Sequence, residues 1–234
     1  RKALALDPDA VGVEAVDCLM FARSYQIDFT PDLYRAEARR YGEMVMAKAR
    51  PYQDWTADPA PQALRVGMVS ADFLSHPVGY FLESVLAHLK SSRLELVAYP
   101  TVAEEDDLTA RIRPCFSAWH PIDNLGDEAA ARRIHDDGIH ILIDLSGHTS
   151  HNRLPVFAWK PAPLQVTWLG YFASTGVPGM DYLLADSTSV PESHQAHFTE
   201  KIWYLPDTRL CFTPPTAVDK LKPAMLPARR NGYL

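Results

Sequence analysis

Two side chains that can move a proton, Asp72 and His76, stand close together in the stretch "SADFLSHP" (70–77). The stretch follows an apolar run typical of a buried β-strand, and Pro77 opens a helical pattern. A carboxylate or an imidazole in such a turn can act as a general acid or base, and a helix N-terminus beside it suits a phosphate. The same residues could instead serve as turn and helix caps, and their spacing alone leaves both interpretations open.

A second polar turn, "SGHTSHNR" (146–153), also follows an apolar run and contains Gly147, His148, Thr149 and His151. A metal site would use the two histidines, but no cysteine joins them and no HExxH pattern is present. A glycine turn with solvated histidines is a second interpretation. We favour a third, a loop that faces a ligand, because the turn follows a predicted strand.

Two more turns of this kind, 169–176 and 186–193, follow later apolar runs. Trp168 stands directly before the first of them, and we expect it to brace that turn. The "DPD" at 7–9 matches the DxD pattern with which metal-dependent glycosyltransferases hold a nucleotide diphosphate, but its place between helical patterns favours capping. The chain contains no GxSxG elbow and no P-loop.

We expect strands and helices to position these turns, because short apolar runs alternate with helical patterns along the chain. Strands are predicted at 65–70, 94–100, 118–122, 140–147, 164–170, 181–186 and 201–206. Helices are predicted near 77–90, 105–114, 126–137 and 152–158. Repeated βα units predict an α/β fold with a doubly wound parallel sheet, in which ligands bind beyond the carboxyl ends of the strands.

The two ends of the chain do not follow this alternation of strands and helices. Residues 1–50 are predicted to be helical, with Thr30 and Pro31 as N-cap and first helical residue of one helix. The opening "ALALDPDA" resembles the end of a tetratricopeptide unit, so repeats are expected upstream. Linkers rich in proline are predicted at 51–64 and 211–234, and they enclose a domain at 65–210.

The composition and charge of the chain argue against several classes of function. The net charge of −6 argues against a nucleic-acid partner, because no basic surplus would neutralise phosphates. No apolar run approaches 18 residues, so no membrane segment is predicted. The three cysteines form no CxxC pair, and a cytoplasmic location is therefore predicted.

Several longer segments of the sequence closely resemble those of one protein family. The strings "VSADFLSHP", "DGIHILIDLSGHT", "KPAPLQVTWLGY" and "EKIWYLPDT" closely resemble the protein O-GlcNAc transferase family, glycosyltransferase family 41, which also holds SPINDLY-type relatives and bacterial homologues. The resemblance implies a bacterial-type GT-B enzyme with two Rossmann-like lobes behind tetratricopeptide repeats. Residues 65–210 would be the N-terminal catalytic lobe, and 211–234 would lead into a second lobe absent from this chain. The isolated chain is then expected to be inactive.

The resemblance also implies roles for particular residues. Asp72 and His76 match the family's "DFxxHP" motif, which makes them the expected catalytic pair, with Asp72 relaying the acceptor's proton and His76 holding the donor. The expected substrate-binding residues lie in the three turns and are Pro77, Gly147, His148, Thr149, Leu169, Gly170, Tyr171 and Phe172.

The implied reaction is inverting transfer of N-acetylglucosamine from UDP-GlcNAc to Ser or Thr hydroxyls of a protein, without a metal or other cofactor. One departure bears on the donor, because Phe172 and Ala173 stand where the family often has proline and glycine. GDP-fucose or another nucleotide sugar is therefore an alternative donor. From a different class, a non-catalytic repeat-protein scaffold and a metal-dependent hydrolase remain alternatives.

Overall fold

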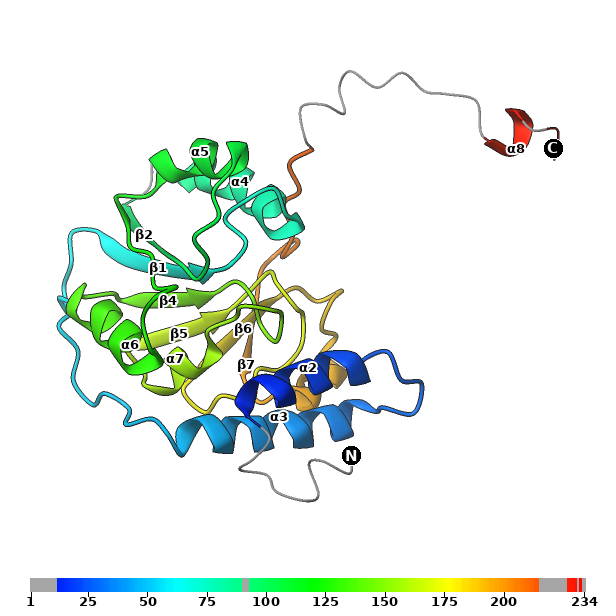
Figure 1. Cartoon of the computed structure of the whole chain (residues 1–234), viewed down its shortest axis with the longest axis horizontal. Coiled ribbons are helices and arrows are strands. Elements are labelled where there is room, and N and C mark those ends of the chain that lie inside the picture. The colour runs from blue at the N-terminus through cyan, green and yellow to red at the C-terminus, as the bar shows by residue number, and fades with distance from the viewer. Residues whose placement is uncertain (1–11, 90–92, 215–226, 231, 233–234) are drawn as a thin grey trace.

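A seven-stranded sheet of parallel strands forms the centre of the molecule, with the order β3-β2-β1-β4-β5-β6-β7 (Figure 1). The computed structural model describes residues 12–89, 93–214, 227–230 and 232. The strands are β1 (Leu64–Ser70), β2 (Leu94–Pro100), β3 (Ala118–Trp119), β4 (Ile141–Asp144), β5 (Leu164–Thr167), β6 (Tyr182–Ala185) and β7 (Lys201–Tyr204). The predicted parallel sheet is confirmed, although several strands end earlier than the apolar runs suggested.

Helices cover both faces of this sheet. They are α2 (Val13–Arg23), α3 (Pro31–Met46), α4 (Pro77–Leu89), α5 (Asp107–Ile112), α6 (Asp127–Asp136) and α7 (Leu154–Ala158). Short 3₁₀ helices lie at Arg113–Cys115 and Glu192–His197, and a further helix, α8 (Pro227–Arg230), follows near the end of the chain. Helices α4 and α5 pack on one face, whereas α6, α7 and the N-terminal pair α2 and α3 pack on the other (Figure 1). The result is the three-layered α/β arrangement of a Rossmann-like domain.

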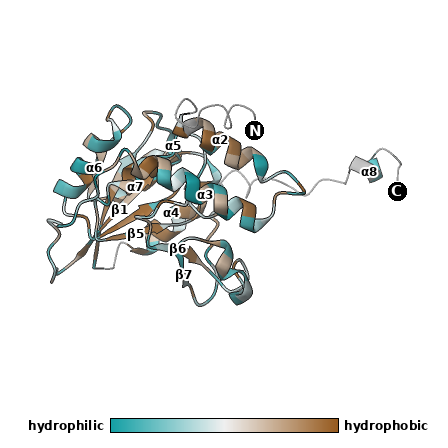
Figure 2. Cartoon of the chain, turned by 90° about the horizontal axis from the view of Figure 1, so that it is seen from below, coloured by the Kyte–Doolittle hydropathy of each residue, from teal (hydrophilic) through white to brown (hydrophobic). Residues whose placement is uncertain are grey.

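Strand β2 shows why consecutive positions are apolar. Val97 and Tyr99 enter the core beneath α6 and α7, whereas Leu96 and Ala98 enter the core beneath α4. Successive side chains of a strand point to opposite faces, so a sheet covered on both faces needs apolar residues at every position. Figure 2 shows the same contrast, with strands such as β1 and β5 hydrophobic and the outer helix α6 largely hydrophilic.

The N-terminal helices lie directly against the sheet domain. The Thr30 side chain accepts a hydrogen bond from the backbone N–H of Leu33 (3.3 Å), which confirms the predicted start of α3. A Cβ built on Gly42 of α3 would lie 1.9 Å from the carbonyl oxygen of Gly176. Gly176 itself has φ +72°, a backbone conformation that favours glycine. Glycines on both sides therefore let α3 contact the 174–178 loop through the backbone.

The segment predicted as a linker, 51–64, is hydrogen-bonded to the domain that it precedes. The N–H of Tyr52 donates to the carbonyl of Trp159 (2.8 Å), and the indole N–H of Trp55 donates to the carbonyl of Lys160 (2.9 Å). The "DPD" motif and most of the segment 211–234 lie outside the described residues. None of the helices that the structure describes is long and apolar enough to cross a membrane.

Candidate active site

The turns that follow β1, β2 and β4 meet where the strand order reverses. The chain moves from β1 to β2 and β3 on one side, then returns to place β4 on the other side of β1. In open parallel sheets, ligands bind beyond the carboxyl ends of the strands at such a reversal. A cleft of about 470 Å³ lies there, and its polar lining side chains are Asp72, His76, Glu104, Thr149, Ser150 and His151.

The predicted pair, Asp72 and His76, lies together in this cleft. Oδ1 of Asp72 is 3.5 Å from Nδ1 of His76. The Asp72 side chain is 19% exposed and the His76 side chain 42% exposed, so the carboxylate is held in the wall and the ring is open to a ligand. The Ser70 hydroxyl accepts the N–H of Asp72 (2.9 Å) and shapes the turn between them and β1.

His76 also caps helix α4, as the capping interpretation of this turn predicted. Its Nδ1 accepts the backbone N–H of Val78 (3.3 Å), which lies one residue beyond Pro77, the first residue of α4. A neutral ring that accepts at Nδ1 carries its hydrogen on Nε2. The capped ring therefore offers Nε2–H as a donor to a ligand beside the helix N-terminus.

Burial raises the pKa of Asp72, and the neighbouring imidazoles of His76 and His151 lower it only in part. A carboxylate with a raised pKa is a better proton acceptor than an exposed one, provided that it is still ionised at the working pH. The position of Asp72 therefore suits a general base.

Two neighbouring elements hold the 72–76 turn in place. A Cβ built on Gly79 would lie 2.2 Å from the carbonyl oxygen of Leu74, so only glycine lets the first turn of α4 approach so closely. From the other side, the Asp106 carboxylate accepts the N–H of Ser75 (2.7 Å), and the Thr109 hydroxyl donates to the carbonyl of Phe73 (2.6 Å).

The turn after β4 is organised around a buried carboxylate. Asp144 accepts the N–H groups of Ser146 (3.1 Å) and Gly147 (3.0 Å) and the Thr167 hydroxyl (2.8 Å). Burial raises the pKa of Asp144 in spite of these donors. Gly147 has φ +62°, and an added Cβ would lie 2.7 Å from the carbonyl oxygen of Tyr171. Gly147 therefore contributes the shape of the turn.

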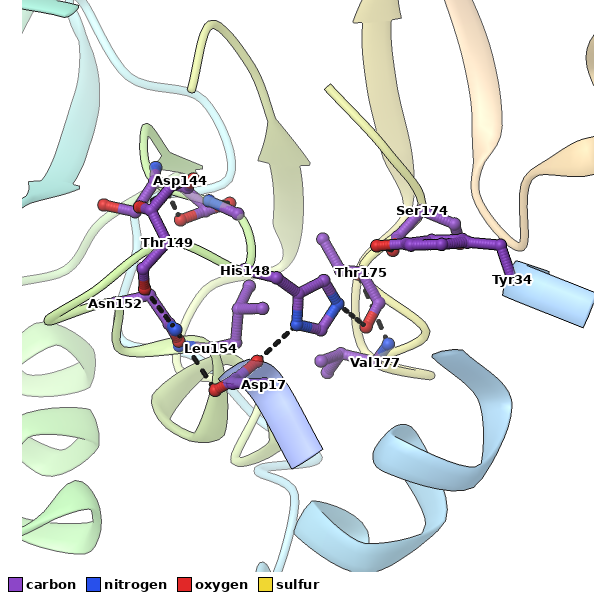
Figure 3. Close-up of polar contacts among 12 residues, drawn as sticks. Asp17, Tyr34, Asp144, His148, Thr149, Asn152, Leu154, Ser174, Thr175 and Val177 are labelled. Atoms are coloured by element: carbon purple, nitrogen blue, oxygen red, sulfur yellow. Dashed lines mark hydrogen bonds and ion pairs between the residues drawn. The ribbon is translucent and has the colours of Figure 1, made fainter. Parts of the chain in front are cut away.

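His148 differs from the prediction that it faces a ligand. Its side chain is fully buried, Nδ1 pairs with the Asp17 carboxylate from α2, and Nε2 lies 3.0 Å from the carbonyl oxygen of Thr175 (Figure 3). The Asn152 amide donates to the same Asp17 carboxylate (3.1 Å). Because both ring nitrogens are engaged inside the protein, His148 positions the turn and does not line the cleft. No local feature of the sequence shows that Asp17 lies there.

Thr149 and His151 continue the same turn into the cleft. The Thr149 hydroxyl donates to the carbonyl of Ser146 (3.1 Å). His151 has φ +59°, and its carbonyl oxygen accepts the Thr101 hydroxyl (2.7 Å). The sequence interpretation placed His151 in a turn expected to face a ligand but gave it an individual role only as an alternative metal ligand, and it did not consider Glu104. Both residues follow predicted strands, and this position was the feature of the sequence that could have identified them.

The third predicted turn packs beside the second. Leu169 has φ +77°, and a Cβ on Gly170 would lie 2.4 Å from the carbonyl oxygen of Leu145. The Tyr171 ring packs against Phe21 of α2, with ring centroids 5.3 Å apart. This turn thus touches both the β4 turn and the N-terminal helices, but its residues are not among those lining the cleft around Asp72.

Phe172 points toward the β6–β7 side of the domain. Its ring contacts Phe198 (centroids 6.1 Å apart), and the Arg209 guanidinium lies 3.7 Å from its centroid. The indole N–H of Trp168 donates to the carbonyl of Arg209 (2.9 Å), so Trp168 connects the start of this turn to the segment after β7. Within the described part of the chain, no group of three or more His, Cys, Asp or Glu side chains is placed to hold a metal ion.

The strand order and the acid–base pair at its reversal define a Rossmann-like α/β lobe of the kind that binds nucleotides at strand ends. A comparison with family models matches glycosyl transferase family 41 over residues 35–215, and the chain belongs to this family. The resemblance drawn from the sequence is thereby confirmed.

Similar proteins agree with this assignment. The probable UDP-N-acetylglucosamine–peptide N-acetylglucosaminyltransferase SPINDLY of Petunia hybrida is 35% identical over 238 residues, which cover 99% of this chain and 25% of that protein. A UDP-N-acetylglucosamine–peptide N-acetylglucosaminyltransferase of Caenorhabditis elegans is 37% identical over 150 residues, 63% of this chain and 13% of that protein. The structure of a mutant O-GlcNAc transferase of Thermobaculum terrenum superposes with a TM-score of 0.84 at 34% identity, covering 92% of this chain and 41% of that one.

Proposed function

We propose that this chain is the N-terminal catalytic lobe of a protein glycosyltransferase that transfers N-acetylglucosamine from UDP-GlcNAc to Ser or Thr hydroxyls with inversion. The observation that carries the proposal is the Asp72–His76 pair, which faces a cleft at the strand-order reversal of a family 41 chain. The names of the relatives, which describe peptide N-acetylglucosaminyltransferases, support the same donor and acceptor class.

The geometry suggests how the chain's own groups take part. The acceptor oxygen forms a bond to the anomeric carbon while its proton passes to the carboxylate of Asp72, directly or through a water. The bond from the anomeric carbon to the diphosphate breaks, and the diphosphate leaves with the electron pair. Nε2–H of His76 and the positive end of the α4 helix dipole would stabilise the negative charge that develops on the donor.

A second lobe would complete the site. The chain spans about a quarter of the length of the curated SPINDLY relative, and the cleft around Asp72 opens at the strand ends. We expect the donor's nucleotide to be held mainly by that second lobe, so the chain alone should bind donor weakly and transfer nothing.

We also propose that the protein is cytoplasmic, in keeping with the free thiols of Cys18, Cys115 and Cys211.

The test is a transfer assay on the protein with its whole catalytic region. Purified protein is incubated with an acceptor protein and each of several nucleotide sugars, and modified Ser or Thr residues are identified by mass spectrometry. Transfer from UDP-GlcNAc that survives exhaustive chelation of metals is the expected result. A matched Asp72→Asn variant shows whether the transfer depends on the cleft.

One observation supports a second donor as the runner-up. Phe172 and Arg209 form a stacked pair beside the turn in which the family contacts the donor sugar. Transfer from GDP-fucose alone would replace the GlcNAc assignment with a protein O-fucosyltransferase. Acceptor binding without transfer from any donor would favour a scaffold, and loss of activity on chelation would reopen the metal-dependent alternative.

A further inference from the structure

His151 lies on the wall of the cleft around Asp72 and comes from a different turn than the Asp72–His76 pair. The charged or titratable side chains that line this cleft are Asp72 and His76 after β1, Glu104 after β2 and His151 after β4. The His151 side chain is exposed, and no hydrogen bond to its ring forms within the residues that the structure describes. Its imidazole therefore faces both the cleft and solvent.

The backbone that presents His151 is strained and held on both sides. Its φ of +59° lies in the left-handed region, which residues with a side chain rarely adopt. The Thr101 hydroxyl donates to the His151 carbonyl (2.7 Å), while the Thr101 N–H donates to the Ser70 carbonyl (3.0 Å). On the other side, Asn152 donates to the carbonyl of Thr149 (2.8 Å) and to the Asp17 carboxylate (3.1 Å). Strain that surrounding contacts enforce is often associated with function.

The two imidazole rings beside Asp72, those of His76 and His151, differ in their hydrogen bonds. Nδ1 of His76 accepts the Val78 N–H, which leaves its proton on Nε2 for the donor sugar nucleotide. A proton that reaches Asp72 must leave again before the next turnover. His151 offers a ring nitrogen that makes no hydrogen bond within the described part of the chain, at the border between the cleft and solvent.

We propose that His151 is the proton outlet of the site, a residue that takes the acceptor's proton from Asp72 and releases it to water. The proposal rests on the proposed transferase function. In each turnover the acceptor proton moves to the Asp72 carboxylate as the glycosidic bond forms, then from protonated Asp72 to neutral His151, and from the imidazolium to bulk water. Asp72 and His151 thereby return to their starting forms.

Electrostatics within the cleft support this route. The positive charge of His151 lowers the pKa of Asp72 against the effect of burial. The same attraction favours the state in which Asp72 is ionised and His151 is protonated, which is the state formed by the second proton transfer. The attraction therefore favours the outward transfer, and it ends when the imidazolium releases its proton to water.

The test uses His151→Gly and His151→Asn in the protein with its whole catalytic region. Both replacements suit the left-handed backbone, so the turn should keep its shape while the imidazole is lost. We expect kcat to fall about 10- to 100-fold, at or below the lower end of what general acid–base groups contribute, with the KM for the donor unchanged. The acid limb of the kcat profile should move to higher pH, because Asp72 loses a charge that lowers its pKa.

Two additional measurements separate a proton role from a structural one. Added imidazole should restore activity to His151→Gly, since the exposed position admits a small base. His88→Asn is the matched control, because His88 is exposed in the last turn of α4 and its ring is hydrogen-bonded to the carbonyl of Ser84 (2.7 Å). That variant should keep the wild-type rate and pH profile.

The proposal is overturned if both His151 variants keep the wild-type kcat and pH profile, if only the KM rises, or if imidazole restores nothing. A wild-type protein that transfers no sugar from any donor would refute the proposed function instead, and His151 would then have no proton to carry. The two failures are distinguishable because the first requires an active wild-type protein.

Discussion

Removing the carboxylate of Asp17 tests how strongly helix α2 is tied to the turn after β4. Asp17 pairs with Nδ1 of His148 and accepts the amide of Asn152 (3.1 Å), so Asp17→Ala leaves two donors without this acceptor (Figure 3). The His148 side chain is 0% exposed and that of Asp17 is 12% exposed. Water therefore cannot replace the lost acceptor without opening the packing around it.

The expected loss follows from these contacts. An orphaned buried donor costs about 1–3 kcal/mol, and removing one partner of a buried ion pair costs about 3–5 kcal/mol. We expect Asp17→Ala to lower the free energy of unfolding by about 3–5 kcal/mol, a large share of the 5–15 kcal/mol that is usual for a domain. Asp17→Asn keeps one acceptor for His148 and should lose about 1–2 kcal/mol, because its own amide then opposes that of Asn152.

Urea unfolding followed by tryptophan fluorescence measures these differences as shifts of the midpoint at constant slope. Asp28→Ala is the matched control on the same N-terminal segment, since Asp28 is exposed, and its change should stay within about 0.5 kcal/mol. In the double variant Asp17→Ala/His148→Leu, the orphaned ring is gone and much of the loss should be recovered. A loss below about 1 kcal/mol for Asp17→Ala would refute the reasoning that this pair is desolvated and tightly bound.

Three further predictions follow from the site and its supports. Asp72→Asn should lower kcat by about 10²- to 10⁴-fold with little change in the KM for the donor, and an unchanged kcat would remove Asp72 from the chemistry. Gly176→Ala should cost about 2–4 kcal/mol in urea unfolding, because its Cβ would lie 1.9 Å from the carbonyl oxygen of Ala38 at φ +72°, whereas Gly126→Ala meets nothing within 4 Å and should cost far less. Desolvation raises the pKa of Asp106, but the N–H groups donating to its carboxylate outweigh that effect and lower the value to about 2. The stabilisation by Asp106 should therefore be complete above its unfolded pKa of about 4 and disappear toward pH 2, so a loss of about 1 kcal/mol in Asp106→Ala at neutral pH should vanish in acid.

Local sequence patterns account for the frame of this site. Consecutive apolar residues in β2 predicted a strand covered on both faces, and Thr30 before Pro31 predicted the start of α3. Asp72 and His76 could be placed at the carboxyl end of β1 because they follow its apolar run directly. Such features depend on neighbours along the chain, so the sequence alone reveals them.

The direction of individual side chains was decided by the tertiary structure. His148 and His151 stand in the same turn, yet one ring is buried against Asp17 and the other lines the cleft beside Asp72. Phe172 likewise turns toward Arg209, which follows β7.

Each of these outcomes depends on a partner that the fold brings from far along the chain. The sequence by itself determined where polar turns meet strand ends, because that follows from local periodicity. Only packing between distant segments decided which of their side chains face a substrate, because the free energy of burying or pairing a side chain depends on what the fold places beside it.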